Sequence, residues 1–366
     1  MIGSEIGGFD PNIHYKVGNE ATTSRHRALL LAGGDTSKIQ LYFMDHVWDN
    51  LDLTKEPTET VDELCDLQCR RLRERYDWLC LWLSGGYDSQ TILSSFIRSG
   101  IKIDEIAYMD RSSYYQDPEI PFILQSATDY QKYHNPACKI FRANIDNNYT
   151  GDLYNRLGED WIFEPGATLR FSKSIASFIQ RHNHQVVKRR LTTPGKRADI
   201  YGKEKPRLDL LNGWWYMYVA DFAYTEVLGS DTVGFFTSDI TPELQVKQVH
   251  MAMRWFETLP GVNHDLVHRI QHNEPAYYMG WNLSVGRISV GCPQSAHAIV
   301  KQHFAHSDVS IDSKKILDHY RATDKSIFDV YIDAKKQLTS IVGEDNMLKS
   351  IKSRKWKIRP FATGKK

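Results

Sequence analysis

Hydrophobic and polar positions repeat with clear periods through the first part of the chain. Residues 61–76 place apolar side chains three and four positions apart among many charges, which predicts an amphipathic helix. An apolar run at residues 81–83 predicts the end of a buried strand, and apolar residues return at helical spacing over residues 92–97. Residues 102–109 then predict a second strand. The order strand, helix, strand indicates a βαβ unit with parallel strands.

The pattern continues with a helix over residues 119–133 and a third strand over residues 139–143. Residues 191–207 are rich in Pro, Gly and basic residues, which predicts a loop. The aromatic residues at 214–224 lie at helical spacing, so we expect them in a core rather than in a base-stacking platform. A further helix is expected over residues 245–259.

Together these elements predict an α/β protein: a doubly wound parallel sheet followed by a mostly helical C-terminal region. Open sheets of this kind bind ligands at the carboxyl ends of their strands, where the turn after residues 81–83 lies. The expected units are an N-terminal extension with edge elements at 1–60, an α/β domain at 61–207, a helical region at 208–348, and a basic, mobile tail at 349–366.

Composition narrows the class of function. The 366 residues are 41% hydrophobic and 25% charged, which is ordinary for a globular protein, and the formal net charge of +1 disfavours nucleic acid as a partner. The five cysteines include no Cys-x-x-Cys pair, which disfavours zinc and suits a reducing compartment. No apolar run is long enough to span a membrane and no signal peptide is evident, so we expect a soluble cytoplasmic protein.

The turn between the first strand and its helix carries the strongest chemical signal. It reads Ser84-Gly85-Gly86-Tyr87-Asp88-Ser89. Glycines let the backbone approach a phosphate, the first N–H groups of a helix point at it, and the two serine hydroxyls add donors. A carboxylate such as that of Asp88 is compatible with phosphate when a divalent cation lies between them. No lysine follows, so this is not the P-loop of kinases and GTPases.

The string Ser-Gly-Gly-x-Asp-Ser resembles the PP-loop of the ATP pyrophosphatases. The resemblance implies that ATP is bound through its β- and γ-phosphates and cleaved at its α-phosphate, with Mg²⁺ as the cation. It implies that Leu83 through Ser89 line the nucleotide, that Asp88 is a metal ligand, and that Met109 contacts adenine. A plain core methionine is an equally good interpretation of Met109. A glycine-rich turn without a ligand is the alternative for the loop.

The residues from Tyr42 to the loop resemble the entry to the synthetase domain of asparagine synthetases. Downstream, residues 193–202 resemble a second motif of that family, which implies that Asp199 is the second magnesium ligand and a catalytic residue. Its Asp-Ile pair is more similar to the β-lactam synthetase branch. Lys196 and Arg197 in this segment are expected to pair with pyrophosphate. A basic surface loop is the alternative interpretation of the segment.

Two lysines late in the chain, Lys335 and Lys336, resemble a further motif of the family. The resemblance implies that one of them is catalytic and stabilises the acyl-transfer state and the pyrophosphate. The arginines that accompany this motif are missing here. A solvated helix face is therefore as good an interpretation of both lysines.

These resemblances imply an ATP-dependent ligase that adenylates a small carboxylate substrate, releases pyrophosphate and forms an amide. Only residues 1–83 precede the loop, too few for the glutaminase domain of amidotransferases, so nitrogen is expected from free ammonia, a separate glutaminase or an amine. Two alternatives stay open: an enzyme that adenylates tRNA or DNA bases, and a non-catalytic nucleotide-binding protein. Salt-sensitive binding to nucleic acid would favour the first, and ATP binding without turnover the second.

Overall fold

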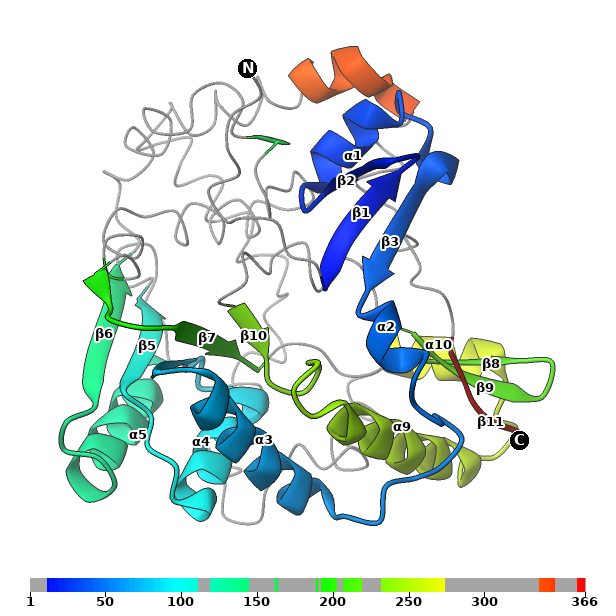
Figure 1. The fold of residues 1–366 in the computed structure, drawn as a ribbon. Helices are drawn as coiled ribbons and strands as arrows, with labels where there is room; N and C mark the ends of the chain where they lie inside the picture. Colours follow the sequence, from blue (N-terminus) through cyan, green and yellow to red (C-terminus); the bar gives the residue numbers. More distant parts are fainter. Residues whose placement is uncertain are drawn as a thin grey trace.

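The computed structural model of the protein describes residues 12–110, 119–144, 162–163, 189, 192–202, 207–218, 232–273, 336–345 and 361–365. Within these residues the chain forms three β-sheets with helices packed around them (Figure 1). The largest, a five-stranded sheet, carries the glycine-rich turn.

This largest sheet is parallel throughout. Its strands are β4 (Trp78–Trp82), β5 (Glu105–Asp110), β6 (Lys139–Asn144), β7 (Arg197–Tyr201) and β10 (Thr232–Gly234). Their order across the sheet is β10-β7-β4-β5-β6, so the chain enters at the middle strand β4, moves outward to β6, and returns to the other side of β4. The direction reverses between β4 and β7, which is where open α/β sheets bind their ligands.

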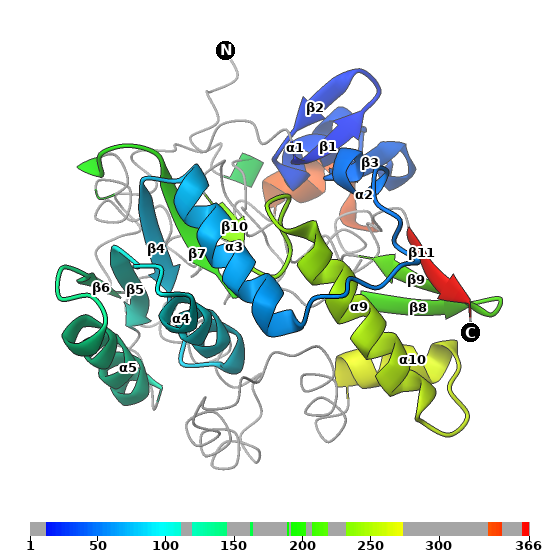
Figure 2. The ribbon, with the colours of Figure 1, turned by 60° about the horizontal axis from the view of Figure 1, so that its bottom comes forward.

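Among the described helices, three cover one face of this sheet: α3 (Val61–Arg75), α4 (Tyr87–Ser99) and α5 (Ile120–Tyr133) (Figure 2). α3 begins with a capping box, in which Thr60 and Glu63 exchange hydrogen bonds. α4 begins at the glycines of the turn and ends at Gly100, whose φ of +69° is the left-handed conformation that glycine adopts readily.

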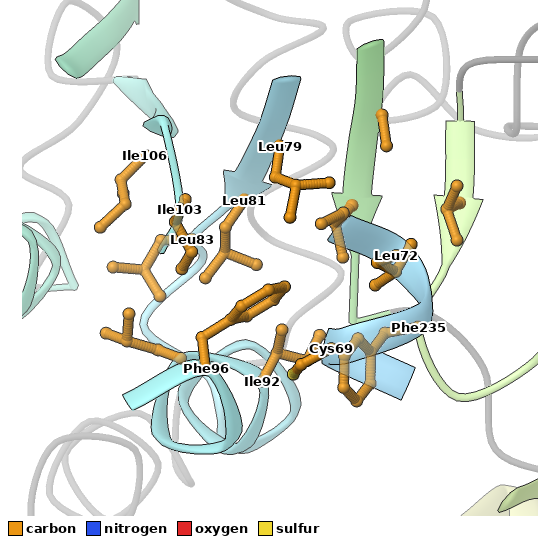
Figure 3. Packing of buried hydrophobic residues seen from close by; sticks show 14 of the residues in the cluster. Cys69, Leu72, Leu79, Leu81, Leu83, Ile92, Phe96, Ile103, Ile106 and Phe235 are labelled. Carbon is orange, nitrogen blue, oxygen red and sulfur yellow. The ribbon is translucent and has the colours of Figure 1, made fainter. Parts of the chain in front are cut away.

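Alternation along β4 builds the core between the sheet and these helices. Leu79, Leu81 and Leu83 point toward α3 and α4, where they meet side chains such as Phe96 (Figure 3). Each fully buried leucine contributes roughly 1.5–3 kcal/mol relative to an exposed one. The residues between them along the strand face the opposite side of the sheet and pack in a separate cluster.

Most elements of this layer confirm the sequence prediction. α3, β5, α5 and β6 lie within a few residues of the stretches expected for them. The exception is β7, because Arg197–Tyr201 falls in the stretch that was expected to be a loop. All of its residues are buried, and its two charged side chains are neutralised by each other, by Glu105 and by Arg189. A polar local composition therefore concealed a central strand.

A second sheet lies near the N-terminus and is antiparallel, with the order β2-β1-β3 (Figure 1). Its elements are β1 (Ile13–Val17), β2 (Glu20–Thr22) and β3 (Ile39–Phe43), with α1 (Arg25–Leu31) and α2 (Asp45–Trp48) beside them. The strand β3 is an edge strand, as expected for this region. The β1–β2 hairpin had no recognisable period because each strand is only three to five residues long.

The third sheet, with the order β11-β9-β8, corrects two expectations. Its strands are β8 (Arg207–Leu211), β9 (Trp214–Tyr218) and β11 (Phe361–Lys365). The aromatic run was expected to be a helix, and the end of the basic tail was expected to be mobile. The turn residues Asn212 and Gly213 have positive φ angles of +51° and +77°, as a two-residue hairpin requires.

Two further helices join this sheet to the rest of the structure. α9 (Pro242–Glu257), close to the predicted helix, packs against both α3 and β8, and α10 (His264–Asn273) packs against β8. Trp215 and Phe256 are fully buried in the second apolar core that results. In the part of the chain that the structure describes, no helix is both long and apolar enough to cross a lipid bilayer.

One histidine of the N-terminal unit is buried without charge. The Nδ1 of His26, on α1, donates to the backbone oxygen of Ile162 over 2.8 Å. Burial lowers the pKa of His26 from 6.5 to about 4, while this hydrogen bond opposes the shift and the Arg25 cation adds to it. The folded protein therefore holds His26 neutral at pH values where the unfolded chain would protonate it.

The free energy of unfolding should fall as the pH is lowered from 7 to 5. In this window the unfolded chain binds a proton at His26 and the folded chain does not. The contribution of His26 to the free energy of unfolding is therefore complete above pH 6.5 and falls as the pH approaches 4. At pH 5 the loss should be roughly 2 kcal/mol. Urea unfolding at both pH values would measure it. Between pH 7 and pH 5, the free energy of unfolding of the variant His26→Gln should fall by about 2 kcal/mol less than that of the unaltered protein. Equal decreases in the two proteins would contradict a neutral, buried His26.

Candidate functional site

The glycine-rich turn follows β4 directly and leads into α4. The Leu83 N–H donates to the carbonyl of Ala107 on β5, which holds the start of the turn to the sheet. Gly85 has a φ of +72°, a conformation that favours glycine. Gly86 is the N-cap of α4, and no side chain caps the helix. Tyr87 is its first residue. The helix therefore presents its positive dipole end at the edge of the sheet, with the Asp88 side chain in its first turn.

The two serines of the turn hold it closed. The Ser84 N–H donates to the Ser89 Oγ, and the Ser89 hydroxyl donates to the carbonyl of Gly86, each over 3.1 Å. The two hydroxyl oxygens are also 3.1 Å apart. Ser89 is only 2% exposed whereas Ser84 is exposed. Ser89 therefore shapes the loop, whereas Ser84 is the serine that is accessible from outside.

Two neighbouring segments pack against this turn. A Cβ placed on Gly85 would lie 3.3 Å from side-chain atoms of both Glu119 and Ile123, at the start of α5. A Cβ on Gly202, the residue after β7, would lie 2.9 Å from the Asp88 Cβ and from the Ser89 nitrogen. The ends of β4 and β7 and the start of α5 thus meet at one edge of the sheet. Our sequence analysis gave Gly202 no role, although it ends the segment compared with the second family motif.

Asp88 and Met109 lie at the same edge. Asp88 is in the first turn of α4 and is half-buried. Met109, the next-to-last residue of β5, is half-buried and packs against the cluster on the far face of the sheet. The expected contacts of Asp88 with Mg²⁺ and of Met109 with adenine stay predictions.

Lys196 and Arg197 lie at the opposite end of the sheet from the turn. The Lys196 N–H donates to Asp77 Oδ2 over 2.7 Å, and Arg197 pairs in register with Trp78 at the start of β4. Because β4 and β7 are parallel, roughly 17 Å of strand separates this end from the turn. The expectation that these two residues pair with pyrophosphate is therefore wrong. The matching segment is the beginning of a strand and not a loop beyond its end.

Asp199 is also displaced from its expected position beside Asp88. It pairs in register with Cys80 in the middle of β4, three residues before Gly202, and it is fully buried. Its Oδ1 accepts from Arg197 Nη2 over 2.9 Å and from Trp82 Nε1 over 3.1 Å. A carboxylate already neutralised by arginine inside the sheet layer is not an open metal ligand, so we remove Asp199 from the metal-binding and catalytic residues.

The charges around Asp199 also shift the pKa values of neighbouring groups. Burial lowers the pKa of Arg197, but the ionised forms of Cys80 and Asp199 outweigh it, so the pKa of Arg197 is raised above its usual value. Burial raises the pKa of Cys80 well above that of a free thiol, and the Asp199 carboxylate adds to the shift. Cys80 is therefore a protonated thiol at neutral pH and not a nucleophile.

Of the two late lysines, the structure describes Lys336, which it does not bring to the turn. Lys336 is an exposed residue of a helical segment at residues 336–342, which lies beside α1 and well apart from α4 (Figure 1). This placement agrees with a solvated helix face and gives no support for a catalytic Lys336. Lys335 lies outside the described residues.

Comparison of the sequence with models of known protein families finds no match, and comparison with curated proteins finds no similar chain. Across the described ranges, no group of three or more His, Cys, Asp and Glu side chains is arranged to hold a metal ion. A Mg²⁺ ion that bridges Asp88 to phosphate needs no such group, because Mg²⁺ is usually bound through one or two carboxylates, phosphate oxygens and water.

The substitution Gly202→Ala tests whether ATP binds at the turn, as expected from the sequence, and should weaken that binding. The added Cβ would meet backbone and Cβ atoms at 2.9 Å, so the first turn of α4 must shift. We expect about tenfold weaker binding in isothermal titration, with a loss of stability of roughly 1–3 kcal/mol. Gly234→Ala, at the end of the neighbouring strand β10, is the matched control, since its Cβ would meet the carbonyl of Thr237, in the turn that follows β10, at 3.1 Å. Equal ATP affinity in the two variants would rule out this contact as part of the site.

Proposed function

We propose that this protein is an ATP-dependent ligase of the PP-loop type, which adenylates a carboxylate and forms an amide. The observation that carries the proposal is the position of residues 84–89. The strand–turn–helix unit with a left-handed Gly85 lies where the order of the parallel sheet reverses. That combination of an uncapped helix N-terminus and a glycine turn favours a bound phosphate chain.

The residues of the turn divide the binding of the triphosphate among them. The backbone of Gly85 and Gly86 and the first turn of α4 receive the β- and γ-phosphates, and the Ser84 hydroxyl donates to one of their oxygens. Asp88 would hold Mg²⁺, which supplies positive charge against the pyrophosphate as it leaves. The presence of Asp88 in the first turn of α4, next to the proposed phosphate site, supports this role.

The proposed reaction has two steps. A carboxylate oxygen of the acceptor attacks the α-phosphorus of ATP, the bond from that phosphorus to the bridging oxygen breaks, and pyrophosphate leaves. An amine or ammonia then attacks the acyl carbon, loses a proton, and displaces AMP. The choice of a carboxylate and an amine rests on the resemblance of the residues before the loop to asparagine synthetases. The loss of Asp199, Lys196 and Arg197 from the site removes their support for that branch of the superfamily.

The fate of ATP labelled in its α-phosphate tests the proposal. Purified protein with Mg²⁺, ammonia and a filtered extract of small molecules should form labelled AMP and unlabelled pyrophosphate. Fractions of the extract would then identify the carboxylate. Labelled ADP as the product would contradict α-phosphate cleavage.

The variant Asp88→Asn separates chemistry from folding in the same assay. It keeps the shape of the side chain and removes the negative charge that would hold the cation. We expect AMP formation to fall by about 100-fold or more with little change in melting temperature. Turnover as fast as that of the unaltered protein would remove Asp88 from the proposed metal site.

A further inference from the structure

Four charged side chains form a closed ring on the face of the sheet that lies away from α3, α4 and α5. Arg197 contacts Glu105 (Nη1 to Oε2, 3.1 Å) and Asp199 (Nη2 to Oδ1, 2.9 Å). Arg189 contacts the same two acids, at 2.9 Å for Glu105 and 3.6 Å for Asp199. Each arginine therefore bridges both carboxylates, and the ring has no net charge.

The register of the sheet explains how this ring fits. Glu105, Cys80 and Asp199 are partners in one row across β5, β4 and β7. Neighbouring strands lie about 4.8 Å apart, so the two acids stand roughly 10 Å apart with β4 between them. The small side chain of Cys80 leaves space for the arginines to reach across β4. The ring thus ties together three strands, including the two at which the strand order reverses.

Each acid of the ring also accepts an indole N–H from β4. Trp78 Nε1 lies 3.3 Å from Glu105 Oε2, at the amino end of the strand. Trp82 Nε1 lies 3.1 Å from Asp199 Oδ1, at the carboxyl end. The two tryptophans are four residues apart on the same face of β4, so they contact the same charged ring from opposite ends of the strand.

The part of the ring near the carboxyl end of β4 lies next to the candidate site. Trp82 stacks on Tyr201, with ring centroids 5.6 Å apart and planes 9° apart. Leu83 and Ser84 follow Trp82, and Gly202 follows Tyr201. Gly202 is the residue that touches the first turn of α4. A continuous set of contacts therefore runs from the buried ring to both strand ends that border the turn.

We infer that Asp199 and Trp82 are positioning residues that set the carboxyl ends of β4 and β7, and with them the contact of Gly202 with the start of α4, for phosphate binding. Stability alone does not account for such a ring. Charges buried in this way lose hydration, and well-packed apolar residues in their place are often at least as stabilising. What a ring of paired charges adds is a fixed register, because the charges pair in this way only when β4, β5 and β7 are aligned as they are here. The inference rests on the proposed function, because it concerns the binding of ATP at the turn.

Two matched variants test it in the full-length protein. Trp82→Phe and Trp78→Phe each remove one indole N–H from an acid of the ring and keep an aromatic ring on the same face of the same strand. Hydrogen exchange of the backbone amides measures the order of the turn, and isothermal titration with ATP and Mg²⁺ measures binding. Asp199→Asn is a further variant that keeps the shape of the side chain, for use if Trp82→Phe does not fold.

Trp82→Phe should speed exchange at residues 83–90 and 202 and weaken ATP binding by about tenfold, as expected for one hydrogen bond to a charged group. Trp78→Phe should leave both within about twofold of the unaltered protein, because its indole lies far from the turn. Equal rates of amide exchange at the turn in the two variants would overturn the positioning role of Trp82, whatever their affinities for ATP. Failure of the unaltered protein to bind ATP would instead contradict the proposed function, and the exchange measurement would still decide the positioning role.

Discussion

The parallel pairing of β4 with β7 is the constraint on which the rest of the structure depends. It places the strand that precedes the glycine-rich turn beside the strand that ends at Gly202, and it does so where the strand order of the sheet reverses. The two ends meet so closely that only glycine fits at position 202 without displacing α4. The same pairing aligns Asp199 with Cys80, which makes the buried ring possible. One strand pairing therefore fixes both the shape of the candidate site and the charge network behind it.

This arrangement separates two kinds of polar group that the sequence alone presents together. The groups of the turn, such as the exposed Ser84 and the half-buried Asp88, lie at the edge of the sheet, where the proposed function needs them. The charges of Arg197 and Asp199 lie inside, where they neutralise each other and Glu105. A buried and fully paired charge shapes a site, whereas a half-exposed charge beside a helix N-terminus acts on what binds there.

The elements that could be predicted from sequence are those whose apolar period is long and unambiguous. α3 and α5 carry more than three helical turns of pattern, and β4 and β5 follow or precede helices in the βαβ order. The turn at residues 84–89 could be predicted because glycines and hydroxyls between a strand and a helix are typical of a phosphate-binding turn.

The errors have identifiable physical causes. β7 was missed because it contains two charged residues, and the acid that pairs with Arg197 from the neighbouring strands, Glu105, is distant in sequence. β9 was mistaken for a helix because every residue of Trp214–Tyr218 is aromatic or apolar, so neither period stands out. Asp199 matched a motif by spacing along the chain, but spacing does not reveal which end of a parallel strand a residue occupies.

A crystal structure of the protein with Mg²⁺ and an ATP analogue that resists cleavage between the α- and β-phosphates is the most direct test of the central claim. It should show the β- and γ-phosphates against the backbone of Gly85 and Gly86 and the first turn of α4, within hydrogen-bond distance of the Ser84 hydroxyl, with Mg²⁺ between them and Asp88. A nucleotide bound at any other part of the molecule would contradict the assignment of the turn at residues 84–89 as the phosphate site.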